Sequence, residues 1–252
     1  MVRVTNETNG NYCRVEDGRL VRPFHSDPAS AVTTFVHDSF RALALNEHFS
    51  CVGGRAAVRQ NAYCFGLYNE IGCEHSSNAL ALDLSRFNSD DTLAGRPFTA
   101  FVASFLGPVP ASEVEFEALL WATLRQLRDA DDRPWTAARE ADPDDPHFGF
   151  SFGEVGLFVV GLHAGSSRVA RRFAFPTLVF NPHAQFDRLR QENKYARFRD
   201  VIRARDVQLQ GTVNPMVHDF GDASEARQYS GRAVGDRWRC PFGHGHHAEE
   251  NT

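Results

Sequence analysis

The chain has 252 residues, of which 42% are hydrophobic and 23% are charged, and its formal net charge is −5. A globule of this length buries roughly three quarters of the surface that its unfolded chain exposes, so it can form a full core without disulfide bonds. The charges lie in many short mixed segments with no basic stripe, which argues against nucleic acid as a partner.

The five cysteines are an odd number at irregular spacing and contain no CxxC pair. We therefore expect reduced thiols in a cytoplasmic protein, rather than a disulfide framework or a structural zinc site. The first residues contain no apolar signal-peptide core, and no window approaches the about 18 consecutive apolar residues of a membrane-spanning helix. Contact with a membrane is not expected either.

Residues 1–24 are polar, with scattered Gly and Asn, and are typical of a flexible N-terminal arm. A first helix is predicted to begin at Pro28, with Asp27 as its N-cap, because apolar residues then recur at spacings of three and four. A short helix from Arg55 leads into a predicted strand over residues 62–68.

A further helix is expected over residues 77–87, and a strand of β-branched and aromatic residues over 98–106. Ser112 and Glu115 form a capping box, which predicts the start of the most regular helix of the chain. An apolar stripe with helical spacing follows this box as far as Leu127.

A strand near residues 148–152 and a second over 157–162 are separated by a Gly-Glu turn, which indicates a hairpin. Another apolar run ends at Asn181, and Pro182 then opens a predicted helix. A last helix is expected over residues 195–209.

Helices and strands interleave without regular βαβ alternation, internal repeats or a low-complexity linker. We therefore predict a single α+β domain over residues 25–242, with a mixed or antiparallel sheet flanked by helices. Within it, residues 211–242 are expected to be mostly irregular. Residues 243–252 form a predicted disordered tail.

Two histidines follow the ends of two neighbouring predicted strands, and three arginines lie between them. His163 ends the first strand and His183 follows the second, while the connecting loop carries Arg168, Arg171 and Arg172. Neutral imidazole ligates metals and haem iron, and arginine forks bind carboxylates. This pattern predicts a site for a planar, anionic, partly apolar ligand; structural histidines and a solvated arginine loop are the alternatives.

Two cysteines stand out because of their neighbours. Cys51 precedes two glycines, which are expected to break regular structure, and Cys240 precedes Pro241. A thiolate at either position could ligate haem iron, whereas the simpler interpretation makes both of them small buried residues. A Cys/His hydrolase is a further alternative, although no local nucleophile signature supports it.

Glu225 lies in a stretch with little apolar content, among Asp219, Ser224 and Gln228. Such a segment is ordered only where polar contacts hold it. A carboxylate there could bind the guanidinium of a substrate, because a planar guanidinium donates to both oxygens of a carboxylate. An ordinary surface loop is the alternative.

Eight stretches of the chain match a known family pattern in the same order. They are FSCVGGRAAVR (49–59), FGLYNEIG (65–72), DPDDPHFGFSF (142–152), VVGLHAGSSRVARRF (159–173), VFNPHAQFDRLR (179–190), LQGTVNPMVHDFG (209–221), SEARQYSGR (224–232) and WRCPF (238–242). Together they resemble the YqcI/YcgG family, whose proteins are also described by FPC and CPF motifs. In this chain Ser50 stands where the family pattern has proline before Cys51, and Ala164 follows His163 where proline is usual.

The members of that family with assigned activity are haem-dependent N-hydroxylases of natural-product pathways, such as the pre-guanitoxin N-hydroxylase. The resemblance implies a b-type haem, dioxygen as co-substrate, and insertion of one oxygen atom into an N–H bond of L-arginine or a derivative. An external electron-donating reductase is also implied, because the chain shows no flavin or nicotinamide motif. A haem carrier without turnover is the alternative, and a homodimer is an open alternative to a monomer.

The resemblance does not identify the axial ligand of the iron, and four residues are candidates for it. His163 is the first choice, because a residue at the end of a rigid strand is well placed for a metal bond. His183 is the second choice, and a thiolate from Cys51 or Cys240 is the third.

The remaining roles also follow from the resemblance. The three loop arginines would meet the haem propionates, and the Phe-rich walls would cover the macrocycle. Glu225 or Asp219 would hold the guanidinium of the substrate, with Ser224 and Gln228 beside it. Glu225 and His183 would be the catalytic residues.

Overall fold

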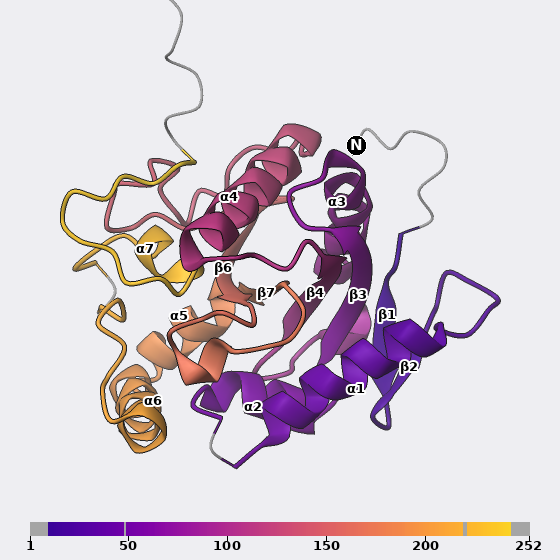
Figure 1. Ribbon diagram of the computed structural model, residues 1–252, viewed down its shortest axis with the longest axis horizontal. Helices are drawn as coiled ribbons and strands as arrows, with labels where there is room; N and C mark the ends of the chain where they lie inside the picture. Colours follow the sequence, from indigo (N-terminus) through magenta and orange to yellow (C-terminus); the bar gives the residue numbers. More distant parts are fainter. Residues whose placement is uncertain (1–9, 48, 219–220, 243–252) are drawn as a thin grey trace, which may run out of the picture.

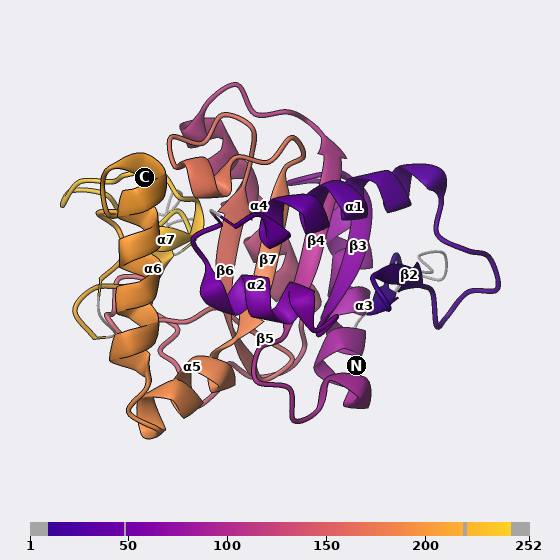
Figure 2. The same ribbon diagram turned by 90° about the horizontal axis from the view of Figure 1, so that it is seen from below.

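A mixed β-sheet with helices on both faces forms the centre of the protein (Figures 1 and 2). The computed structural model describes residues 10–47, 49–218 and 221–242. Within these ranges the strand order across the sheet is β2-β1-β3-β4-β7-β6-β5. The strands are β1 (Cys13–Glu16), β2 (Arg19–Val21), β3 (Tyr63–Glu70), β4 (Ala100–Gly107), β5 (Ser151–Phe152), β6 (Val155–Leu162) and β7 (Thr177–Pro182).

The helices divide into two covering layers and a group beside β6. Helices α3 and α4 cover one face of the sheet, α1 and α2 cover the other, and α5, α6 and α7 lie beside β6 (Figures 1 and 2). The bounds are α1 (Ala31–Leu45), α2 (Val52–Arg59), α3 (Glu74–Asn88), α4 (Glu113–Ala130), α5 (His183–Gln191), α6 (Tyr195–Gln210) and α7 (Ala226–Tyr229). The chain therefore has the predicted α+β fold in one domain.

One pair of strands, β3 and β4, is parallel, and α3 forms the crossover between them. The other neighbours in the sheet pair antiparallel. In the β6–β7 pair, Leu157 is opposite Pro182 and Leu162 is opposite Thr177. The C-terminal ends of β6 and β7 consequently lie at opposite ends of this pair.

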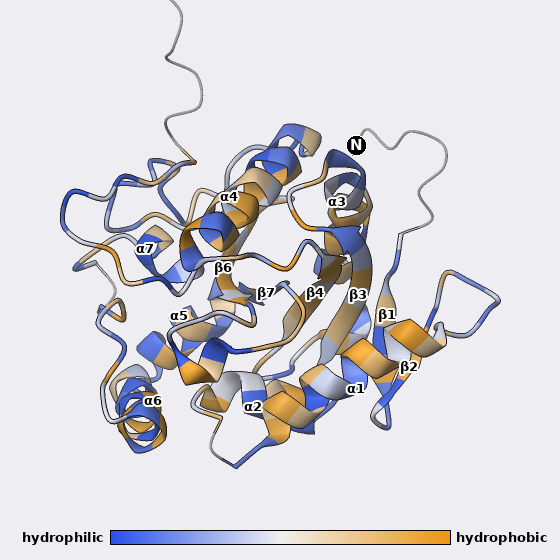
Figure 3. Cartoon of the chain, in the orientation of Figure 1, coloured by the Kyte–Doolittle hydropathy of each residue, from blue (hydrophilic) through white to orange (hydrophobic). Residues whose placement is uncertain are grey.

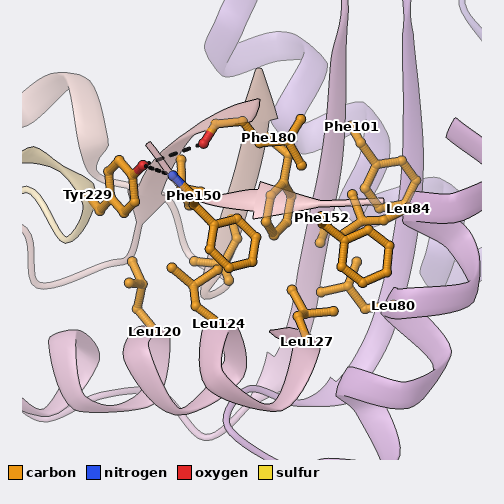
Figure 4. Close-up of a cluster of buried hydrophobic side chains, with 14 of the residues drawn as sticks. Leu80, Leu84, Phe101, Leu120, Leu124, Leu127, Phe150, Phe152, Phe180 and Tyr229 are labelled. Atoms are coloured by element: carbon orange, nitrogen blue, oxygen red, sulfur yellow. Dashed lines mark hydrogen bonds between the residues drawn. The ribbon is translucent and has the colours of Figure 1, made fainter. Parts of the chain in front are cut away.

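Each face of the sheet has its own hydrophobic cluster. The cluster under α3 and α4 is rich in Leu and Phe (Figure 4). The cluster under α1 and α2 contains Val36, Phe40, Tyr63 and Phe65. Hydrophobic residues dominate the central strands, whereas α6 is largely hydrophilic (Figure 3). The sheet and its four covering helices thus form the rigid part of the molecule, and α6 adds little to the core.

Most predicted elements are present, with shifted ends. The helix predicted from Pro28 begins at Ala31, because Ser30 accepts a hydrogen bond from the Thr33 amide (3.1 Å) and serves as the N-cap. One of the two hydrogen bonds of the predicted capping box at α4 is confirmed: the Ser112 hydroxyl accepts from the Glu115 amide (3.1 Å).

The two glycines after Cys51 do not break regular structure. They lie inside α2, and Cys51 is the N-cap of that helix. A Cβ on Gly53 would lie 3.1 Å from the ring of Phe98 and 3.2 Å from that of Phe198. Close packing, rather than a turn, therefore accounts for glycine at this position.

The prediction of a loose N-terminal arm is wrong for residues 11–21. These residues contribute the hairpin β1–β2, and β1 pairs with β3. Asp17 and Gly18 form the turn with positive φ angles of 49° and 78°, as a type I′ hairpin requires. The rest of the predicted arm up to residue 9, and the predicted tail at 243–252, lie outside the described residues.

None of the helices in the described ranges combines the length and the apolar character that crossing a membrane requires.

A buried carboxylate anchors the start of the described chain. Asp83 on α3 accepts hydrogen bonds from the Asn11 amide (2.6 Å), from the Tyr68 hydroxyl (2.8 Å) and from Arg86 (3.1 Å). Burial raises the pKa of Asp83 from 3.8 to about 6, although these donors act in the opposite direction. The N-terminal segment is therefore attached to α3 through a carboxyl group that titrates close to neutral pH.

Because the pKa of Asp83 is raised in the folded state, its contribution to stability should be full below about pH 4 and should be lost as the pH rises through about 6. Urea unfolding of the wild type and of Asp83→Asn at several pH values should show the difference in unfolding free energy changing by about 3 kcal/mol across this window. If the difference in unfolding free energy between the two proteins did not depend on pH, the raised pKa of Asp83 would be contradicted.

Candidate functional site

A cavity of about 230 Å³ lies against β6, between α5, α6 and the residues that follow α6. Its apolar wall comes from alternate residues of β6 and from one side of α5 and α6. These side chains are Phe158, Val160, Leu162, Phe186, Phe198 and Ile202. The cavity therefore combines a rigid wall, the sheet, with an outer wall formed by helices of mixed polarity.

Residue alternation along β6 decides which side chains reach this cavity. Successive side chains of a strand point to opposite faces, so Leu162 faces the cavity and His163 faces α4. The His163 ring stacks on Phe116 of α4 with 4.4 Å between ring centroids. It is fully buried, and among the described residues neither ring nitrogen has a hydrogen-bond partner. His163, the first choice for an axial ligand, is thus outside the cavity.

The two histidines predicted to meet do not lie together. His163 follows the end of β6 and His183 follows the end of β7, and these ends point in opposite directions along the sheet. By this register the strand ends themselves, Leu162 and Pro182, are about 17 Å apart along the strand direction, and each histidine lies one residue further out. Only His183 lines the cavity.

The charged end of the cavity is a cluster of His183, Glu225 and Tyr229. His183 Nε2 lies 2.9 Å from both carboxylate oxygens of Glu225. The Tyr229 hydroxyl donates to Glu225 Oε1 and accepts from the Phe150 amide (3.1 Å; Figure 4). An ionised carboxylate only accepts, so the His183 proton is assigned to Nε2. Burial, with the adjacent carboxylate, raises the pKa of Tyr229 well above its usual value, which keeps its hydroxyl protonated.

Backbone features hold His183 in place. Pro182 is the N-cap of α5, and His183 is the first residue of the helix. A Cβ on Gly156 would lie 2.8 Å from His183 Nδ1, and a Cβ on Gly149 would lie 2.8 Å from its Cε1. The ring therefore packs directly against two glycines, and its buried Nδ1 has no hydrogen-bond partner in the described part of the chain.

Of the polar residues predicted beside Glu225, one lines the cavity and one shapes the turn. Gln228 lines the cavity. Ser224 is buried, donates to the Pro143 carbonyl (2.6 Å) and accepts from the Ala226 amide (3.2 Å). Ser224 thus positions Glu225 at the start of α7. Asp219 lies outside the described residues.

The three arginines have three different environments. Arg171 lines the cavity and donates to the carbonyls of Gly161 (3.3 Å) and Tyr229 (3.0 Å). It forms no ion pair within the described residues, and burial lowers its pKa to about 10. Arg168 also lines the cavity but is paired with Asp206 (3.1 Å). Arg172 is outside the cavity and donates to the Ser166 carbonyl (2.8 Å).

The two candidate thiols, Cys51 and Cys240, lie in different surroundings. Cys51 lines the cavity, and its sulfur accepts from the Gly54 amide (3.3 Å). Burial raises its pKa, although the amides at the start of α2 act in the opposite direction. Cys240 is fully buried in the core under α4, and burial raises its pKa to about 12. Among the described residues no hydrogen bond joins Cys51 to His183, so the Cys/His pair of a hydrolase is not formed.

Sequence reasoning missed Tyr229 and Asp206. Tyr229 follows Glu225 by four residues, and this spacing brings side chains together on one helix face. That spacing could have identified Tyr229. Asp206 reaches Arg168 across 38 residues of sequence, and no local pattern signals such a contact.

Replacing Tyr229 by Phe should lower the unfolding free energy by about 1–3 kcal/mol, because the Phe150 amide and the Glu225 carboxylate each lose a buried partner. Urea denaturation measures this change. A variant within about 0.5 kcal/mol of the wild type, the range of ordinary surface substitutions, would contradict the arrangement.

Comparison with known proteins identifies the family of this chain but no individual relative. No curated protein and no solved structure matches the chain. The family model of the YqcI/YcgG family matches residues 40–243, which include the whole β3–α7 region and both helices that wall the cavity. The chain belongs to the YqcI/YcgG family.

Proposed function

We propose that the protein is a haem-dependent N-hydroxylase that uses dioxygen to oxidise a guanidino group, with L-arginine or an arginine derivative as substrate. The observation that carries the proposal is the Glu225 carboxylate, which is only 12% exposed and lines a cavity with an apolar wall in a protein of this family. We place this activity in the cytoplasm, in a natural-product pathway.

Glu225 retains the capacity to bind a cation. A carboxylate has about four lone-pair sites, and here His183 and Tyr229 use only part of them. A planar guanidinium donates to both oxygens of a carboxylate. At 12% side-chain exposure the carboxylate is shielded from water, which strengthens its attraction for a cation. The role of Glu225 would be to bind and orient the substrate.

The lining of the cavity fits a haem in its chemistry. The apolar side chains of β6, α5 and α6 suit the face of a macrocycle, and Arg171, which has no ion pair among the described residues, suits a propionate. A bound haem would supply the activation of dioxygen, and an external reductase would supply electrons. The surrounding side chains would exclude water and set the orientation of the substrate.

Space in the cavity limits how haem and substrate bind together. Its volume of about 230 Å³ is below the roughly 300–1,000 Å³ typical of ligand sites. One wall must therefore move outward.

Two of the four candidate axial ligands line the cavity, namely His183 and Cys51. His183 offers no free ring nitrogen to the cavity, because Nε2 binds Glu225 and Nδ1 faces glycines. Ligation by His183 would require Glu225 to release it. Ligation by Cys51 would cost only the weak hydrogen bond that its sulfur accepts from the Gly54 amide. We therefore propose Cys51 or His183, rather than His163 or Cys240, as the ligand.

Purified protein reconstituted with haem should show a Soret band that shifts when L-arginine is added. Glu225→Gln should keep the band and weaken L-arginine binding about 10- to 100-fold, as expected for the loss of a charge-assisted hydrogen bond. Glu70→Gln, the same substitution at an exposed residue of β3, is the matched control and should bind normally. Protein that stays colourless after reconstitution would reject the proposal.

The haem spectrum also tests the position of the haem. Cys51→Ser or His183→Ala should change the ferric spectrum, because each removes a donor at the cavity. His163→Ala and Cys240→Ala should leave it unchanged. If only His163→Ala changes the spectrum, the haem binds on the α4 side of β6 and the cavity is not its site.

A further inference from the structure

A second, smaller hollow adjoins the main cavity. It has a volume of about 20 Å³ and lies between α2, the residues before β4, and helices α5 and α6. It shares Cys51, Asn181, Phe186 and Phe198 with the lining of the main cavity. A small molecule in the hollow would therefore be separated from the main cavity by side chains alone.

The walls of the hollow are almost entirely apolar or already paired. Small α2 residues, Gly53 and Ala57, form one side, and the stacked rings of Phe98 and Phe198, with 5.5 Å between centroids, form another. Rings and small aliphatic groups offer water nothing to bind. The hollow therefore resembles the apolar cavities that stay dry and accept noble gases.

Several polar atoms of its lining are engaged elsewhere. Gln185 Oε1 accepts from the Thr99 amide (2.9 Å), and Asn181 Nδ2 donates to the Phe158 carbonyl (3.1 Å). The Cys51 sulfur accepts from an amide of α2. One water requires roughly 10–15 Å³ and two to four polar partners. The hollow meets the first condition but supplies few free partners for the second.

We propose that this hollow binds a small apolar gas molecule and holds dioxygen beside the main cavity. The assignment to dioxygen rests on the proposed N-hydroxylase function, whereas the gas site itself rests on the shape and polarity of the hollow. Gly53 closes one side of the hollow, and a Cβ there would press on both rings, at 3.1 Å from Phe98 Cδ1 and 3.2 Å from Phe198 Cζ.

Xenon is the probe for the gas site. Crystals of the full chain pressurised with xenon should show an occupied site between α2 and the Phe98–Phe198 pair. Gly53→Ala should abolish this occupancy. Alanine favours the helix more than glycine does, but its Cβ crowds the two rings, so urea unfolding of this variant is measured alongside. Phe98→Leu, which enlarges the hollow, should increase occupancy. Gly235→Ala is the control, because a Cβ there meets no atom within 4 Å.

Two results would overturn the gas site: an empty hollow in the wild type, or unchanged xenon occupancy in Gly53→Ala. The haem-loaded protein then tests dioxygen, since Gly53→Ala should raise the KM for dioxygen and leave the KM for L-arginine unchanged. Xenon binding with an unchanged KM for dioxygen would overturn the assignment to dioxygen. Xenon binding in a protein that takes up no haem would reject the proposed function but not the gas site.

Discussion

The buried carboxylate of Glu225 is the constraint on which the cavity depends. Removing a carboxylate from water costs several kcal/mol unless donors surround it. His183 and Tyr229 supply those donors, and both are fixed by the main chain, His183 against two glycines and Tyr229 by the Phe150 amide. The sheet, α5 and α7 must therefore all be in place before the cavity acquires its charged end. A site built in this way is already oriented when its ligand arrives.

The sequence predicts the elements of the fold better than their relative directions. Apolar periodicity and capping residues identify the helices and most strands, because these signals are local. The position of His163 depends on whether β6 and β7 pair parallel or antiparallel. Their connection, residues 163–176, is long enough for either arrangement. Antiparallel pairing sends the two strand ends apart, and alternation along β6 turns His163 toward α4.

One further feature is detectable in the sequence but is obscured by the composition around it. Asp17-Gly18, flanked by Val15 and Leu20, is a strong hairpin signal, yet the polar composition of the first 24 residues suggests an arm. The burial of Asp83 explains why this segment is ordered, and no local pattern reveals that contact. Contacts such as Arg168 with Asp206 arise only once α6 is packed, so they belong to tertiary structure alone.

Tyr229 connects two charged groups of the cavity, Arg171 and Glu225. Its carbonyl accepts from Arg171, and its hydroxyl donates to Glu225. A shift of α7 that adjusts one group must therefore move the other. Natural variants that bind different ligands in this cavity should accordingly differ at both Arg171 and Glu225.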